Sequence, residues 1–176
     1  NSYGSEYDFN FISGSSHLVD GIDPYYESFW HGLTAKEGIE KYLMSIADNI
    51  KICDKFDVYG HIDYIVRYVQ DRDFIYNCED FTDYIDEILT LLIYKGKGIE
   101  LNTSGWKYGL CHPHPCDGII KKYKKLGGEI ITVGSDGHRP EHLAYGFDRI
   151  PEYLRSCGFE YFTVFEQRKP SFIKLP

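Results

Sequence analysis

The spacing of hydrophobic residues along the chain predicts helices that alternate with short strands. Apolar residues every three or four positions predict a helix that begins at a capping box of Thr34 and Glu37 and ends near Asp54. The same spacing predicts helices over residues 80–94, 116–126 and 148–157, with a short helix from Pro140. Short apolar runs predict strands over residues 7–13, 56–59, 129–133 and 161–165, while residues 170–176 are expected to be irregular. This alternation predicts an α/β fold in a single domain of residues 1–176.

Three of the predicted strands end at small residues that are followed by histidine or aspartate. The motifs are Gly14-Ser15-Ser16-His17, Gly60-His61-Ile62-Asp63 and Gly134-Ser135-Asp136-Gly137-His138. Glycine and serine let the backbone turn sharply and leave room for an ion, and imidazole and carboxylate groups are common metal ligands. Each motif alone is more often an ordinary turn or a core histidine. Together they predict a metallohydrolase built on a β/α barrel.

Composition and charge narrow the classes of partner and compartment. A formal net charge of −8 argues against nucleic acid, whose phosphates need a basic surface. No apolar run is long enough to span a membrane, and the first residues lack the regions of a signal peptide. The five cysteines form no Cys-x-x-Cys pair, so we expect free thiols in a reducing cytoplasm. A zinc knuckle of Cys111 and Cys116 is the alternative.

The strand-end motifs and one further segment give the chain a family resemblance. Together with Ile-Glu-Leu-Asn-Thr-Ser-Gly at residues 99–105, they closely resemble the later motifs of the PHP (polymerase and histidinol phosphatase) superfamily, in order and spacing. The Asn-Thr-Ser-Gly segment and Gly-Gly-Glu-Ile-Ile-Thr at residues 127–132 resemble its histidinol-phosphatase branch in particular. The resemblance covers nearly the whole chain and implies a distorted TIM-like (β/α) barrel.

The opening motifs of the superfamily have no counterpart in the chain. The family begins with a His-x-His motif, followed by further histidines and a bridging glutamate, and nothing before His17 matches these. We therefore expect the C-terminal two-thirds of a PHP domain, lacking its N-terminal strands. His112-Pro113-His114-Pro115 has the wrong position for the opening motif, and its prolines favour an extended turn. The sequence leaves open whether this chain alone is active, and in what oligomeric state.

The resemblance implies a metal-dependent phosphatase whose partner is a small-molecule phosphate ester. The branch hydrolyses L-histidinol phosphate to L-histidinol and phosphate in histidine biosynthesis, with a trinuclear site for which zinc, manganese and iron are candidates. Matched by position, His17, His61, Asp136 and His138 are expected to bind metal, and Asp136 and His138 to be catalytic. Such ions lower the pKa of a bridging water and neutralise phosphate oxygens.

Three further residues are expected to bind substrate. Arg67 stands where the branch carries a phosphate-binding arginine, and Lys107 stands where we expect a second one. Lysine keeps the charge but loses the bidentate geometry of arginine. Asn102 lies near the rim of the predicted barrel and is expected to contact substrate or to hold a supporting hydrogen bond in the site. Glu100 is either a hydrogen-bonding residue of the site or a buried structural carboxylate.

Three classes of function stay open on the sequence alone. The Asn-Thr-Ser-Gly segment favours a histidinol-phosphatase. A wide pocket without an anionic position for an imidazole-amine substrate would instead favour another PHP phosphoesterase, acting on a small phosphate ester or a nucleotide. The absence of the opening ligands adds weight to a non-catalytic metal-binding remnant.

Overall fold

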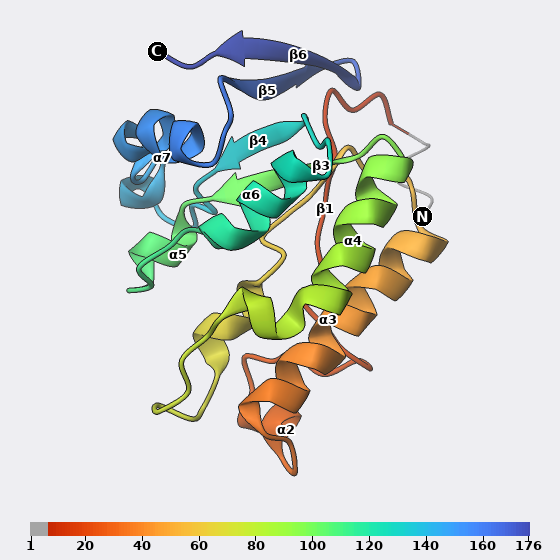
Figure 1. Ribbon diagram of the computed structural model, residues 1–176, viewed down its shortest axis with the longest axis vertical. Coiled ribbons are helices and arrows are strands. Elements are labelled where there is room, and N and C mark those ends of the chain that lie inside the picture. Colours follow the sequence, from red (N-terminus) through yellow and green to blue (C-terminus); the bar gives the residue numbers. More distant parts are fainter. Residues whose placement is uncertain (1–6) are drawn as a thin grey trace.

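Four parallel strands form the centre of the protein, whose computed structural model describes residues 7–176. The strands are β1 (Ser13–Gly14), β2 (Val58–Tyr59), β3 (Gly98–Asn102) and β4 (Ile131–Gly134), hydrogen-bonded in that order. Within residues 7–176 these strands form an open arc, because β1 pairs only with β2 and β4 only with β3; Figure 1 shows β3 and β4 within it. Because each pair is parallel, all four carboxyl ends meet at the same edge of the sheet. The α/β class is therefore confirmed.

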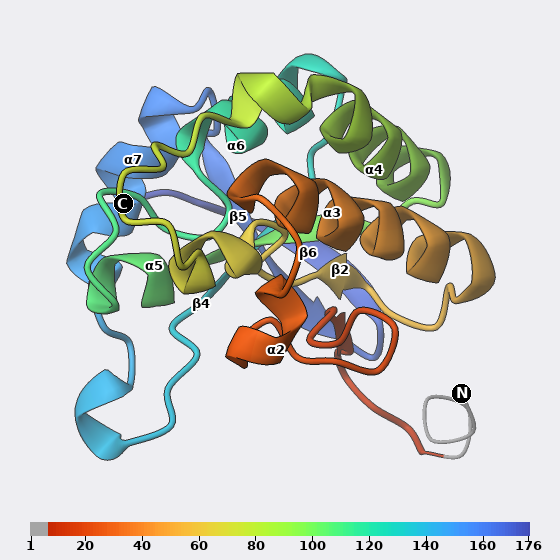
Figure 2. The same cartoon turned by 90° about the horizontal axis from the view of Figure 1, so that it is seen from below.

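Helices pack along one face of this sheet. Figure 2 shows α3 (Ala35–Ile52), α4 (Thr82–Tyr94) and α6 (Asp117–Lys125) side by side over the strands. The apolar face of α3 is buried, and Leu43, Ile46 and Ile50 are fully inaccessible to solvent. They join Leu89 of α4 and Ile99 of β3 in one core. Burial of each of these side chains stabilises the folded protein by about 1.5–3 kcal/mol. This packing holds the helices against the sheet whose strand ends carry the site.

The predicted helices are confirmed with small changes at their ends. Thr34 Oγ1 accepts a hydrogen bond from the Glu37 backbone, and Glu37 Oε2 accepts one from the Thr34 backbone, which is the expected capping box. The helix predicted from residue 80 begins as a single 3-10 turn, η2 (Cys78–Phe81). The remaining helical elements are α2 (Glu27–Trp30), η1 (Tyr64–Tyr68), α5 (Ser104–Lys107), η3 (Pro140–His142), η4 (Phe147–Arg149) and α7 (Ile150–Ser156).

The C-terminal segment corrects one prediction. Residues 170–176 were expected to be irregular, but β6 (Lys169–Lys174) pairs antiparallel with β5 (Tyr161–Glu166). The tight turn between the strands has Gln167 and Arg168 at positive φ, the geometry that matches the twist of a hairpin. This hairpin forms a separate two-stranded sheet that lies beside β4, where Thr163 Oγ1 accepts from the backbone of Ile131 at 3.2 Å (Figure 1).

The first predicted strand is also shorter than expected. Of residues 7–13 only Ser13 pairs as a strand, together with Gly14, because the preceding segment makes single hydrogen bonds instead of a ladder. Ile12 makes two hydrogen bonds with Asp57. The backbone N–H of Asp57 donates to the Ile12 carbonyl, and the Asp57 carboxylate accepts from the Ile12 N–H. Within residues 7–176, no helix is long and apolar enough to cross a membrane.

Candidate active site at the carboxyl ends of the parallel strands

The loop after β1 brings His17 to the edge of the sheet where the strands end. Ser16 fixes this loop, because its carbonyl accepts from Tyr42 of α3 and its hydroxyl accepts from Asn49, also of α3. The His17 ring is exposed and lies edge-on to the His61 ring, with 5.0 Å between the ring centroids. The two predicted metal-binding histidines from β1 and β2 are therefore neighbours.

His61 is buried and has a strained backbone. Its φ is +31°, outside the usual range for a residue with a side chain, and its Nδ1 is buried without a hydrogen-bond partner in the described chain. Burial, together with the nearby rings of His17 and His114, lowers the pKa of His61 to about 4. A buried, neutral imidazole with a free nitrogen is suited to bind a metal ion.

Asp136 and His138 form a second pair in the loop after β4. The His138 Nε2 atom lies 3.2 Å from Asp136 Oδ1, and the His138 ring is largely exposed. Asp136 also has a positive φ, +47°. Its charge opposes the lowering of the His61 pKa, so this loop lies within electrostatic reach of the histidine pair. Backbone strain at both His61 and Asp136 is of the kind that concentrates at functional sites.

Glu100 occupies the space that Gly60 and Gly134 leave open. A Cβ at Gly60 would lie 3.0 Å from Glu100 Oε2, and one at Gly134 would overlap Glu100 Oε1. Burial raises the pKa of Glu100, partly against the hydrogen bond from Asn102, and the charge of Asp136 raises it further. The glycines were predicted to make room for an ion, and in the structure they make room for this carboxylate between the ends of β2 and β4.

The buried side chain of Asn102 makes hydrogen bonds within the protein. Its side chain is 2% exposed, Nδ2 donates to Glu100 Oε2 at 3.0 Å, and Oδ1 accepts from the Ser104 backbone at 3.0 Å. Its backbone also pairs with His114 in both directions. The residue that was expected to contact substrate or to hold a supporting hydrogen bond therefore positions Glu100 and the start of α5.

Arg67 and Lys107 bring positive charge to the same edge. The Arg67 guanidinium lies 4.2 Å from the ring centroid of Tyr64, and its Nε and Nη1 are buried without partners among residues 7–176. Lys107 Nζ donates to the carbonyls of Ser135 and Asp136, at 3.2 and 2.8 Å. Burial lowers the pKa of Lys107, while Asp136 raises it and Arg67 lowers it further, so these three charges are neighbours. Lys107 holds the Asp136 loop, and two N–H groups of Arg67, at Nε and Nη1, have no partner among residues 7–176.

A buried Asp63–His114 pair lies beneath this edge, and the sequence reasoning missed it. His114 Nδ1 lies 2.6 Å from Asp63 Oδ1, and the Asp63 Oδ2 atom accepts from the Cys116 backbone at 2.8 Å. The two side chains are 0% and 1% exposed. Burial alone would raise the pKa of Asp63, but the charge and hydrogen bond of His114 lower it. His114 was expected to belong to an extended turn, and the spacing of 51 residues between the partners gave no local signal of the pair.

The donor chemistry of the edge fits a metal ion, but the described residues do not close a ligand set. His61 Nδ1 is an unpartnered buried nitrogen, and imidazole and carboxylate donors are the types that zinc, manganese and iron accept. Between residues 7 and 176, no three His, Cys, Asp or Glu side chains are gathered closely enough to hold a metal ion. Cys111 and Cys116 are free, one exposed and one buried, which gives no support to a zinc knuckle.

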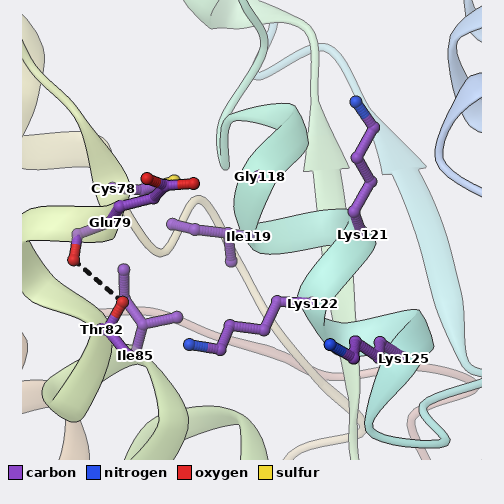
Figure 3. Close-up of a pocket in the computed structure, with 9 residues that line it drawn as sticks. All are labelled: Cys78, Glu79, Thr82, Ile85, Gly118, Ile119, Lys121, Lys122 and Lys125. Atoms are coloured by element: carbon purple, nitrogen blue, oxygen red, sulfur yellow. Dashed lines mark hydrogen bonds between the residues drawn. The ribbon is translucent and has the colours of Figure 1, made fainter.

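A groove between η2, the start of α4 and α6 lies away from this edge (Figure 3). It measures about 440 Å³, and Lys121, Lys122 and Lys125 of α6 line one side. Lys121 and Lys122 already pair with Asp117 and Asp86, at 2.7 Å each. The groove holds none of the strand-end residues, so we place the candidate site at the sheet edge.

Comparison with families of known proteins agrees with this geometry. A family model described as the PHP domain matches residues 3–104, more than half of the chain. The chain belongs to the PHP family. The matched part includes the His17, His61 and Arg67 segments, and it ends at the Asn-Thr-Ser segment after β3.

Two curated PHP relatives carry the same name. One is a probable histidinol-phosphatase of Clostridium acetobutylicum, 30% identical over 172 residues, which covers 95% of this chain and 65% of that protein. The other, from Thermotoga maritima, bears the same name and is 33% identical over 155 residues, or 88% of this chain and 61% of that protein. This chain therefore spans less than two-thirds of the length of these relatives.

A solved structure confirms the PHP fold. The histidinol phosphate phosphatase of Lactococcus lactis, in complex with zinc, L-histidinol and phosphate, superposes with a TM-score of 0.82. The match covers 97% of this chain and 65% of that one, at 24% sequence identity. The arc of parallel strands and its covering helices are thus the arrangement of a PHP protein.

Proposed function

We propose that this chain serves in a metal-dependent phosphatase that hydrolyses L-histidinol phosphate to L-histidinol and inorganic phosphate, in histidine biosynthesis. The observation that carries the proposal is the placement of Arg67 and Lys107 beside Asp136, at the strand ends that also present His17 and His61. The relatives named above and the histidinol and phosphate bound by the Lactococcus lactis enzyme support the choice of substrate.

Within this proposal the chain's own residues have separate tasks. Divalent ions such as zinc, held by His17, His61, Asp136 and His138, would lower the pKa of a water and neutralise phosphate oxygens. Arg67 binds the phosphate through its unpartnered N–H groups, as charge-assisted hydrogen bonds to an anion require. Asp136 holds the attacking water by accepting its hydrogen at a carboxylate oxygen, while Lys107 keeps the Asp136 loop in place through its two carbonyl contacts.

We further propose that residues 1–176 belong to one PHP domain and that the protein acts in the cytoplasm on a small molecule, not on nucleic acid. The free thiols of Cys78, Cys111, Cys116 and Cys157 support a reducing compartment. The chain's net charge of −8 supports a small-molecule substrate over a phosphate polymer.

Release of inorganic phosphate from L-histidinol phosphate tests the function. We expect the full-length natural protein, loaded with zinc or manganese, to hydrolyse this ester faster than nucleotides or other small phosphate esters. Asp136→Asn should abolish the release, whereas Asp48→Asn, a matched change on the exposed surface of α3, should leave it unchanged. Faster hydrolysis of another ester would contradict the proposed substrate. If the metal-loaded protein hydrolyses no phosphate ester, the proposal that it is a phosphatase is wrong.

A further inference from the structure

Three tyrosine rings surround the guanidinium of Arg67. The Arg67 Cζ atom lies 4.2 Å from the ring centroid of Tyr64, 4.8 Å from that of Tyr68 and 4.5 Å from that of Tyr108. Tyr64 and Tyr68 belong to η1, and Tyr108 follows α5, so the rings come from two separate segments. We call these three residues the tyrosine clamp. Each such contact attracts the cation and restricts the plane of the guanidinium.

The clamp leaves Arg67 without a counterion. No carboxylate of residues 7–176 forms an ion pair with it, and its Nε and Nη1 atoms are buried without hydrogen-bond partners. Lys107 is close enough to repel it, since the charge of Arg67 lowers the pKa of Lys107. Buried N–H groups without partners are costly, and here the clamp restrains the guanidinium that carries them. An oxyanion is the chemistry that satisfies them.

Tyr64 differs from the other two rings because it also touches the histidine pair. Its ring centroid lies 5.0 Å from that of His17 and 4.8 Å from that of His61. Its hydroxyl accepts a hydrogen bond from Tyr68 at 3.0 Å, which ties the ring to the next turn of η1. One side chain therefore contacts the anion-binding cation and both histidines.

We propose that Tyr64 is a positioning residue that holds Arg67 and the His17–His61 pair in one fixed relation, while Tyr108 positions Arg67 alone. The inference rests on the proposed function, since it assigns the phosphate oxygens of the ester to Arg67 and a metal ion to the histidines. It predicts that the two tyrosines have separable effects. Loss of the Tyr108 ring affects the phosphate, and loss of the Tyr64 ring affects both the phosphate and the metal.

Four variants of the full-length natural protein test this separation, with zinc chloride and inorganic phosphate as probes. Calorimetric titration gives the Kd for phosphate, and elemental analysis after dialysis gives the zinc retained. Tyr108→Leu should weaken phosphate binding by about threefold to tenfold with unchanged zinc, the range expected for one cation–π contact. Tyr64→Leu should weaken phosphate binding by at least about tenfold and lower the zinc content. Tyr64→Phe keeps the ring and should match the parent in both. Tyr26→Leu, which removes an exposed ring near α2, is the control.

The results separate this inference from the proposed function. If the parent fails to hydrolyse histidinol phosphate but the variants show the expected pattern, the positioning role of Tyr64 stands and the function falls. Parent-like phosphate and zinc binding by Tyr64→Leu would overturn the inference even in an active phosphatase. Should circular dichroism show that Tyr64→Leu is unfolded, Tyr108→Leu tests the inference instead. An unchanged phosphate Kd for that variant would refute the role of the tyrosine clamp in positioning Arg67. The same role would be refuted if the unmodified protein bound no inorganic phosphate.

Discussion

The buried Asp63–His114 pair should carry a large share of the protein's stability, and Asp63→Ala removes it. The substitution leaves His114 Nδ1–H and the Cys116 backbone N–H without their acceptor, at positions where the Asp63 and His114 side chains are at most 1% exposed. Each buried donor without a partner costs about 1–3 kcal/mol, and breaking a buried charge pair costs about 3–5 kcal/mol in all. A domain is stable by only about 5–15 kcal/mol, so this is a large fraction.

Urea unfolding of metal-free protein measures the loss directly. With a slope of about 2 kcal/mol per molar urea, a loss of about 4 kcal/mol lowers the midpoint by about 2 M. Asp63→Asn keeps the side-chain volume and one acceptor oxygen, so its free energy of unfolding should fall by less than that of Asp63→Ala. Asp48→Ala breaks an exposed pair with Lys51 and should change the stability by at most about 1 kcal/mol.

A double-mutant cycle shows whether the two side chains act together. Because His114→Ala and Asp63→Ala remove the same contact, the double variant should lose less than the sum of the single losses. Additive losses, or a loss below about 1 kcal/mol for Asp63→Ala, would refute the reasoning that this pair ties the loop before α6 to the end of β2.

Four other changes have expected outcomes. Arg67→Ala should raise the KM for histidinol phosphate by about tenfold to a hundredfold, for the loss of one charged hydrogen bond, with metal content unchanged; an unaltered KM would remove Arg67 from the site. In metal-free protein, the pKa of His61 is lowered from its ordinary value of 6.5 to about 4. As the pH falls, His61 is therefore protonated in the unfolded state before it is protonated in the folded state. Urea stability should thus fall by up to about 3 kcal/mol between pH 6.5 and pH 4, and His61→Gln should flatten that slope. Gly134→Ala should displace Glu100 and weaken metal retention, which elemental analysis measures. Thr34→Ala should lower the unfolding free energy by about 1 kcal/mol through loss of the α3 cap.

Local patterns predicted the helices and strand-end motifs well, because their determinants lie close together in the sequence. The Thr34–Glu37 capping box needs only a spacing of three residues, and the apolar faces of α3 and α4 repeat along single helices. The strand β6 was missed because its pairing with β5 depends on a turn at Gln167 and Arg168, two residue types that seldom adopt positive φ.

The parts of the site that sequence reasoning missed depend on contacts between distant segments. Asp63 and His114 meet because Asn102 pairs with the His114 backbone, which carries the loop before α6 back over the end of β3. The tyrosines around Arg67 were not predicted, since nothing in the sequence places Tyr108 beside η1. Asn102 was expected to contact substrate or to hold a supporting hydrogen bond, but its partner Glu100, placed between two glycines, could not be identified from the sequence.

Anomalous diffraction at the zinc edge, from crystals of the full-length natural protein soaked with zinc and phosphate, tests the central claim most directly. The claim is that a metal-dependent phosphatase site lies at the carboxyl ends of β1 to β4. We predict a zinc peak bonded to His61 and to at least one of His17 and Asp136, with phosphate in contact with Arg67. Zinc bound only at Cys111, or phosphate bound only by the lysines of the α6 groove, would contradict the account.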